Sequence, residues 1–154
     1  MAAREGLEFQ ATIISDCAPL AEIVGELLQA GIKIHCLRDL TRGGLASALN
    51  ELLMATKLTM SIDELAIPVL EEVQGACELL GLDPLYIANE GRFVAFVAPE
   101  DVDRALAILR SNGEAATAIG KVVATLSPVV ILNSKLGTTR ILDLLSGEQF
   151  PRIG

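Results

Sequence analysis

The stretch Arg38-Asp39-Leu40-Thr41-Arg42-Gly43-Gly44 joins two segments of different periodicity, and the fold around it follows from that junction. Residues 32–37 alternate in a way that predicts a strand, whereas residues 45–55 place leucines at helical spacing. The charged, glycine-ended stretch between them is therefore expected to be a turn that opens a helix.

This turn allows two interpretations. Two glycines at a helix start let backbone N–H groups approach an anion, so Asp39, Thr41, Arg42, Gly43 and Gly44 could form a phosphate-handling turn. Alternatively, Asp39 or Thr41 caps the helix and the glycines only make a tight turn. The stretch is not a P-loop, because the spacing GxxxxGKS/T is absent.

Helical and strand patterns alternate along the rest of the chain. Asp16 or Ser15 is suited to cap a helix over residues 19–30, which Gly31 ends. Further helices are predicted over residues 68–80 and 99–110, strands over residues 59–62, 93–97, 116–123 and 129–132, and a short element over residues 140–144. This order predicts an α+β fold, layered as α/β/α with a mixed sheet.

Composition and charge narrow the class of protein. The 154 residues fit one domain, and 51% hydrophobic residues allow a core without disulfides or metals. A net charge of −8 without a run of Lys and Arg argues against nucleic acid as a partner. No apolar run is long enough to cross a membrane, and no signal peptide is visible.

Cysteine usage predicts neither a metal site nor disulfides. Cys17, Cys36 and Cys77 are widely spaced and form no CxxC pair, so a reducing cytoplasm is the simplest setting. Each is expected to be buried and inert. His35 is the only histidine, and a structural role is expected for it.

Glu90 is the second candidate for chemistry. It lies in Ala88-Asn89-Glu90-Gly91, within a predicted connection over residues 85–92. Buried beside a strand, its carboxylate could act as a general base. The alternative is an exposed acid in a turn.

The third candidate is the tail, residues 147–154. Gly147 ends the preceding element and Pro151 cannot continue a helix, so the tail can be mobile and reach another active site. The alternative is a frayed terminus.

Five segments together resemble a known family. They are residues 3–9, 15–20, 38–46, 88–91 and 147–153, and the most specific features are Asp-x-Thr-Arg-Gly-Gly and the Pro-Arg-Ile ending. The chain is similar to the C-terminal domain of the HypE carbamoyl dehydratases, which are hydrogenase expression/formation proteins. The resemblance implies an aminoimidazole ribonucleotide synthetase C-terminal-like fold.

The resemblance also implies that the chain is part of a longer enzyme. Residues 1–15 would lead in from an N-terminal ATP-binding domain that the chain lacks, and residues 16–146 would form the C-terminal domain. Residues 147–154 would be a flexible carrier tail. ATP and magnesium would bind the full-length protein, which dimerises through its N-terminal domain, and neither is expected on this part alone.

The implied activity supplies the cyanide ligand of nickel–iron hydrogenases. The carbamoyltransferase HypF would place a carbamoyl group on a C-terminal cysteine, and ATP-dependent dehydration would convert this thiocarboxamide to a thiocyanate. The cyanide would then pass to iron held by the HypC–HypD complex. By this match Glu90 is the base for the thiocarboxamide nitrogen, and the turn from Asp39 to Gly44 faces the ATP cleft.

The tail departs from the family pattern at its last residue. The family ends Pro-Arg-Ile-Cys, whereas Pro151, Arg152 and Ile153 are followed by Gly154, which has no thiol to carbamoylate. Either the cysteine has been replaced or the chain is a variant with a different tail. This part alone is therefore expected to be inactive. The alternatives are a non-catalytic docking module for maturation partners, and the C-terminal half of a sister ATP-dependent synthetase.

Overall fold

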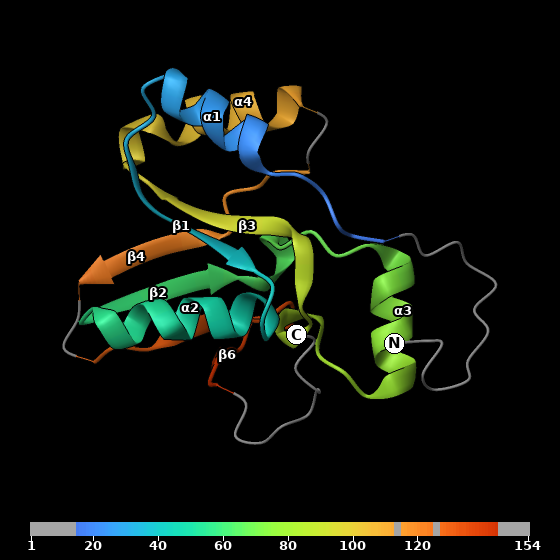
Figure 1. The fold of residues 1–154 in the computed structure, drawn as a ribbon. Helices are drawn as coiled ribbons and strands as arrows, with labels where there is room; N and C mark the ends of the chain where they lie inside the picture. Colours follow the sequence, from blue (N-terminus) through green and yellow to red (C-terminus); the bar gives the residue numbers. More distant parts are fainter. Residues whose placement is uncertain (1–14, 113–114, 125–126, 145–154) are drawn as a thin grey trace.

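The computed structural model describes residues 15–112, 115–124 and 127–144 (Figure 1). In these residues the helices are α1 (Ala21–Gln29), α2 (Gly44–Ala55), α3 (Glu71–Leu80) and α4 (Val102–Ser111). The strands are β1 (Ile34–Leu40), β2 (Leu58–Asp63), β3 (Asn89–Val97), β4 (Gly120–Ala124), β5 (Val130–Asn133) and β6 (Thr139–Ile141). Short 3-10 turns are η1 (Glu64–Ala66), η2 (Pro84–Tyr86) and η3 (Pro99–Asp101). The predicted lead-in, apart from Ser15, and the predicted tail lie outside the described residues.

The described strands form two sheets. β1 and β3 pair antiparallel as a two-stranded ribbon, and the other sheet has the order β4-β2-β5-β6. In the larger sheet β2 and β5 run parallel, whereas the other neighbours run antiparallel. The predicted α+β fold with a mixed sheet is therefore confirmed, and the ribbon is a separate sheet that the sequence pattern did not distinguish.

Helix α2 forms the larger core together with the four-stranded sheet. Its side chains Leu45, Leu49 and Leu53 recur at helical spacing, and all three are buried. They gather with buried side chains from the sheet and the segment after it: Met60, Ile62, Val130, Leu132 and Leu142. Burying one such side chain contributes roughly 1.5–3 kcal/mol, so this face of α2 holds the sheet in place.

The β1–β3 ribbon lies between this core and a smaller one beneath α1 and α4 (Figure 1). Successive side chains of a strand point to opposite faces. In β3, Val94 and Phe96 belong to the α2 core, whereas Phe93 and Val97 pack against the core under α1 and α4. The buried members of that smaller core are Leu27, Ile32 and Ala105. Both faces of the ribbon are thus covered.

Two stretches that were predicted as turns belong to strands. Arg38 and Asp39 extend β1, while Asn89, Glu90 and Gly91 begin β3. Each strand supplies the other with a partner, and this tertiary pairing outweighs the local preference of polar and glycine residues for turns. The turn itself is shorter than predicted and covers residues 41–43.

The predicted side-chain cap of helix α1 is absent. Leu20 occupies the N-cap position of α1 and makes no side-chain capping bond. Ser15 Oγ instead accepts a hydrogen bond from the Cys17 N–H (3.3 Å), and the Asp16 carboxylate bonds to a residue of β3. The residues that were predicted to cap the helix therefore have other partners.

Gly43 and Gly44 are required by the geometry of the turn. Their φ angles are +65° and +62°, a region that favours glycine. A Cβ at position 44 would lie 2.5 Å from the Ile87 carbonyl oxygen and 2.6 Å from the Leu85 carbonyl oxygen. The start of α2 is therefore in close contact with the backbone that follows η2.

We expect Gly44→Ala to destabilise the chain by about 2–3 kcal/mol, because the methyl group meets fixed carbonyls at a positive φ. Gly25→Ala is the control, since no atom lies within 4 Å of the point that its methyl group would occupy, and this helical variant should gain up to about 1 kcal/mol. Urea unfolding of the two variants measures the difference. Equal stabilities would show that the backbone contact at Gly44 is unimportant.

Candidate functional site

The two predicted motifs meet at one end of the β1–β3 ribbon. Asp39 pairs with Phe93, but the next residue, Leu40, pairs with Asn89. Residues 90–92 consequently have no partner in β1 and form an irregularity in the ladder. Such bulges often redirect side chains near active sites. Here the bulge places Glu90 beside the strand end from which the turn at residues 41–43 continues.

A network of side chains orders the end of β1. Arg38 Nη1 donates to Asp39 Oδ1 (2.6 Å), and Arg38 Nη2 donates to Glu51 Oε2 (2.7 Å). Thr41 Oγ1 donates to the same Asp39 oxygen (3.2 Å). The hydrogen bond that Arg38 donates to Glu51 and the negative charges of Glu51 and Asp39 raise the pKa of the Arg38 guanidinium, against a smaller opposing effect of burial. The network therefore holds Asp39 and Thr41 in fixed relation to α2.

The two arginines of this region differ in their availability. Arg38 is engaged by two carboxylates, so its charge is largely neutralised. Arg42 is exposed and forms no ion pair within the residues that the structure describes. Of the two, Arg42 is the one whose charge is open to a bound anion.

Glu90 is exposed, so the premise of a buried carboxylate is wrong for this chain. Its backbone N–H donates to Asp16 Oδ2 (3.0 Å), which attaches the segment before α1 to the start of β3. At the next position, a Cβ on Gly91 would lie 1.9 Å from the Asp16 carbonyl oxygen. The absence of a side chain at Gly91 therefore allows this segment to cross β3.

Asn89, next to Glu90, has a buried amide oxygen that accepts no hydrogen bond among the described residues. Leaving such an acceptor without a donor costs roughly 1–3 kcal/mol. Asn89 is thus a buried polar group at the motif whose amide oxygen is unsatisfied among the described residues.

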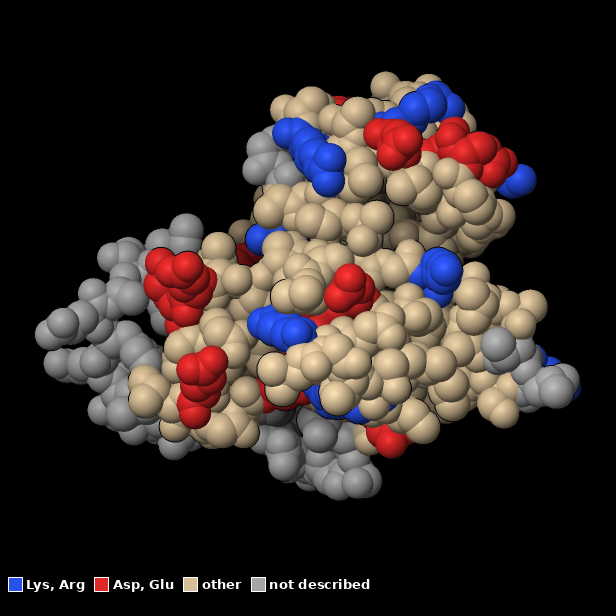
Figure 2. Space-filling model, turned by 180° about the vertical axis from the view of Figure 1, so that it is seen from behind, with Lys and Arg blue, Asp and Glu red and all other residues tan. Residues whose placement is uncertain are grey.

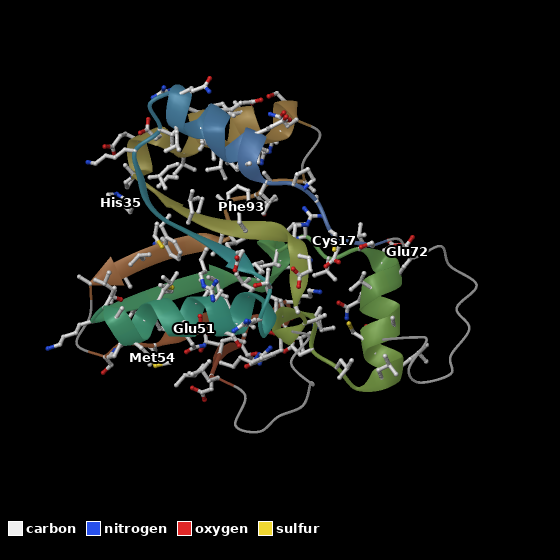
Figure 3. The ribbon with its side chains drawn as sticks, in the orientation of Figure 1. Cys17, His35, Glu51, Met54, Glu72 and Phe93 are labelled. Atoms are coloured by element: carbon white, nitrogen blue, oxygen red, sulfur yellow. The ribbon has the colours of Figure 1, made fainter. Side chains whose placement is uncertain are left out.

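The predictions for Cys17, Cys36 and Cys77 hold only in part. Cys77 is buried, as expected, and burial raises the pKa of its thiol. Cys36 is half-buried and Cys17 is exposed, so the expectation of burial is wrong for Cys17. Figure 3 shows Cys17 on the segment that passes the end of β3, whereas His35 is exposed on β1.

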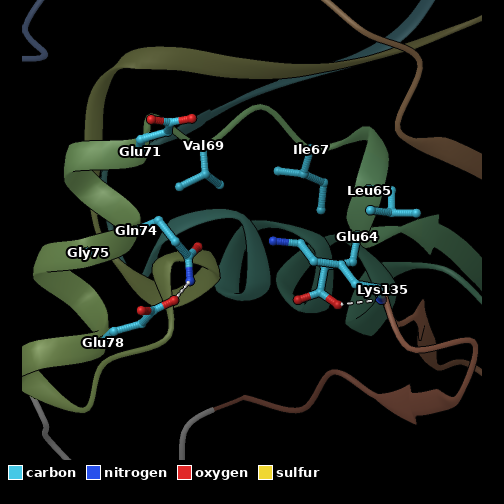
Figure 4. Close-up of a pocket in the computed structure, with 9 residues that line it drawn as sticks. All are labelled: Glu64, Leu65, Ile67, Val69, Glu71, Gln74, Gly75, Glu78 and Lys135. Atoms are coloured by element: carbon cyan, nitrogen blue, oxygen red, sulfur yellow. Dashed lines mark hydrogen bonds between the residues drawn. The ribbon is translucent and has the colours of Figure 1, made fainter.

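A separate groove lies between η1 and α3 (Figure 4). It has a volume of about 450 Å³, and its lining combines Ile67 and Val69 with Glu64, Glu71 and Glu78. Glu64 accepts a hydrogen bond from the Lys135 backbone N–H (2.9 Å). None of the predicted site residues lines this groove.

Neither a metal cluster nor a membrane-spanning helix is present in the described part of the chain. There, no group of three or more His, Cys, Asp or Glu residues could hold a metal ion. Among the same residues no helix is both long and apolar enough to cross a membrane. On the face shown in Figure 2, Lys and Arg side chains are scattered among acidic and uncharged ones. The exclusion of nucleic acid stays a prediction from net charge.

Comparison with known proteins places the fold and both motifs in a family. The model of the family described as AIR synthase related protein, C-terminal domain, matches residues 1–133, and the chain belongs to that family. The chain is 49% identical over 152 residues to carbamoyl dehydratase HypE of Cupriavidus necator, covering 97% of this chain and 43% of that protein. It is 46% identical to carbamoyl dehydratase HypE of Rhodobacter capsulatus, covering 99% of this chain and 46% of that protein.

Solved structures give the same result. A crystal structure of hydrogenase maturation protein HypE superimposes with a TM-score of 0.92 and 42% identity, covering 99% of this chain and 50% of that chain. A HypE structure in complex with ATP superimposes with a TM-score of 0.89 and 39% identity, covering 96% of this chain and 47% of that chain. A HypE–HypF complex superimposes with a TM-score of 0.84 and 41% identity, covering 92% of this chain and 47% of that chain. The chain thus spans about half the length of these relatives, and the predicted resemblance to HypE is confirmed.

Sequence reasoning missed Asp16 and Glu51 as members of this region. Asp16 was interpreted as a helix cap, and Glu51 shows no local signal because it reaches Arg38 only after α2 folds back along β1. The roles of Glu90 and of the turn stay predictions at this point.

The contrast between the thiols can be tested with a thiol reagent on the folded chain. We expect Cys17 to react first, and Cys77 to react slowly and only at higher pH, because the thiolate is the reactive form and burial raises the pKa of Cys77. Cys17→Ser should remove the fast phase, whereas Cys77→Ser should leave it intact. Survival of the fast phase in Cys17→Ser would contradict the exposed position of this segment.

Proposed function

We propose that this chain is the C-terminal domain of an ATP-dependent carbamoyl dehydratase that acts in hydrogenase maturation. The parent enzyme dehydrates a C-terminal cysteine thiocarboxamide to a thiocyanate, while ATP becomes ADP and phosphate. The observation that carries the proposal is the meeting of the segment Asp39–Gly44, from the end of β1 to the start of α2, with Glu90 at one end of the ribbon. Similarity to HypE over nearly the whole chain supports it.

The turn is suited to the phosphate side of this reaction. Arg42 is exposed and unpaired among the described residues, so its guanidinium can pair with a phosphate. The first residues of α2 are buried, so this role falls to Arg42 and not to the helix start. The ATP complex of a HypE relative supports ATP as the phosphoryl donor of the parent enzyme. In this proposal the Arg38–Glu51 pair keeps Asp39 and Thr41 in place and leaves Arg42 for the nucleotide.

Glu90 is suited to proton transfer because its carboxylate is exposed. Dehydration requires removal of protons from the thiocarboxamide nitrogen while its oxygen leaves as phosphate, and an exposed carboxylate can accept such a proton. The desolvation that would strengthen this base is supplied when the rest of the parent enzyme and the tail cover it.

Magnesium would enter the parent enzyme with ATP, and the described part of this chain has no cluster of three or more candidate ligands for it. We infer that the ion is held by the nucleotide phosphates and the N-terminal domain of the parent. That domain, to which residues 1–15 lead, also forms the homodimer.

The partners follow from the same proposal. The HypE–HypF complex supports a HypF carbamoyltransferase as the enzyme that loads the tail, residues 147–154. The cyanide is then delivered to iron on a HypC–HypD complex, and these steps take place in the cytoplasm. A tail that carries the reacting group has to visit more than one protein.

In the parent enzyme carrying Gly154→Cys, replacing Glu90 by Gln should lower thiocarboxamide-dependent phosphate release by about 100-fold or more, because the neutral amide cannot accept the proton. Glu72→Gln removes an exposed glutamate of α3 and should leave turnover unchanged. Phosphate release in single-turnover experiments measures both. Unchanged turnover in the Glu90 variant would remove this residue from the mechanism.

Position 154 gives a second test. We expect Gly154→Cys, in the parent ending at residue 154, to gain one carbamoyl group from the HypF carbamoyltransferase, while the Gly154 protein gains none. Intact-protein mass spectrometry detects the group, and reaction with ATP should then remove one water from it. Equal labelling of both proteins would place the acceptor at another residue of the parent and contradict the role of position 154.

A further inference from the structure

Asp16 makes a contact that helix capping does not explain. Its carboxylate lies before α1 in the chain, yet it accepts a hydrogen bond from the Glu90 N–H and not from the first turn of that helix. These two residues are far apart in sequence and come from different elements. The bond therefore attaches the segment before α1 to the start of β3.

The bulge explains why Glu90 needs this partner. Residues 90–92 are out of register with β1, so the Glu90 amide has no acceptor in the ribbon ladder. A backbone N–H without a partner is unfavourable, and Asp16 Oδ2 at 3.0 Å supplies the missing acceptor. A hydrogen bond to a charged carboxylate is also stronger than one to a neutral carbonyl.

The lack of a side chain at Gly91 allows the segment that carries Asp16 to lie against β3. The Asp16 carbonyl oxygen lies 1.9 Å from the point where a Cβ would stand at position 91, and the Ala18 amide nitrogen lies 3.1 Å from it. The segment from Asp16 to Ala18 therefore rests directly on the β3 backbone. The position of this segment and that of Glu90 are coupled.

The Glu90 side chain has little else to orient it. It is exposed, and no hydrogen bond or ion pair of its carboxylate is present within the described residues. Its direction is therefore set by the backbone to which it is attached. Loss of the backbone anchor would let the carboxylate move by the small distances that reduce catalytic rates.

We propose that Asp16 is a positioning residue for Glu90: by holding the bulged backbone at Glu90 and Gly91, it aims the carboxylate that takes the proton in dehydration. This inference rests on the proposed function, and it assigns no contact between Asp16 and the substrate. It also makes the segment that connects residues 1–15 to α1 part of the site.

The test uses the parent enzyme carrying Gly154→Cys, into which Asp16→Ala or Asp16→Asn is introduced. Asp16→Ala removes the acceptor and should lower kcat about tenfold with the KM for ATP changed less than about twofold. Asp16→Asn keeps an oxygen that can accept the bond and should restore kcat to within about threefold of the unaltered enzyme. Rescue by Asn is not expected if the negative charge of Asp16 acts on the substrate.

Asp63→Ala is the matched control. Asp63 Oδ1 also accepts a backbone N–H, that of Leu65 (3.1 Å), but at the start of η1 and outside both strands of the ribbon. Its loss should leave kcat unchanged. Hydrogen exchange at the Glu90 amide gives a readout besides activity, and it should become faster in Asp16→Ala but not in Asp16→Asn or Asp63→Ala.

The outcomes separate this inference from the proposed function. If Glu90→Gln is inactive while folded Asp16→Ala keeps full kcat, the positioning role is wrong and the role of Glu90 stands. If Glu90→Gln keeps full turnover, both are wrong. If Asp16→Ala does not fold, Gly91→Ala tests the same contact, because its methyl group displaces the Asp16 backbone; unchanged kcat in that variant would overturn the inference.

Discussion

The β1–β3 ribbon is covered on both faces, and this double burial is the constraint on which the rest of the fold depends. One face completes the core of α2 and the four-stranded sheet, and the other completes the core under α1 and α4. A shift of the ribbon by one residue would exchange the faces on which Phe93 and Val94 lie. Each side chain would then point into the core that the other one fills. The registry of the ribbon is thereby fixed, and with it the end where Glu90 and the turn meet.

The sequence alone predicted the elements that have strong periodicity. The leucines of residues 45–55 and the alternation of residues 32–37 indicated a helix and a strand, and both are present. The same local reasoning placed Arg38 and Glu90 in turns, because charge and glycine dominate those windows. Their strand geometry comes from pairing between segments that are distant in sequence, and the contacts of Asp16 and Glu51 have the same origin.

Charge in the candidate site is arranged by pairing more than by burial. Two exposed carboxylates engage Arg38, and exposed pairs of this kind add only about 0–1 kcal/mol of stability. Their effect is to orient the Arg38 side chain and to neutralise its charge. Arg42 is then the arginine of this segment that has no ion pair among the described residues. In the proposed function, Glu90, which is exposed in this chain, would gain a low-dielectric environment when the rest of the parent enzyme covers it.

The parallel pairing of β2 with β5 has a kinetic consequence for the chain. Between these neighbouring strands the sequence passes through α3, β3, α4 and β4, so the sheet closes only after a long loop is ordered. Contacts of such high contact order form slowly, whereas α2 can form from local contacts. Until the sheet closes, the apolar face of α2 is open to other chains, and refolding at low protein concentration would favour the native product.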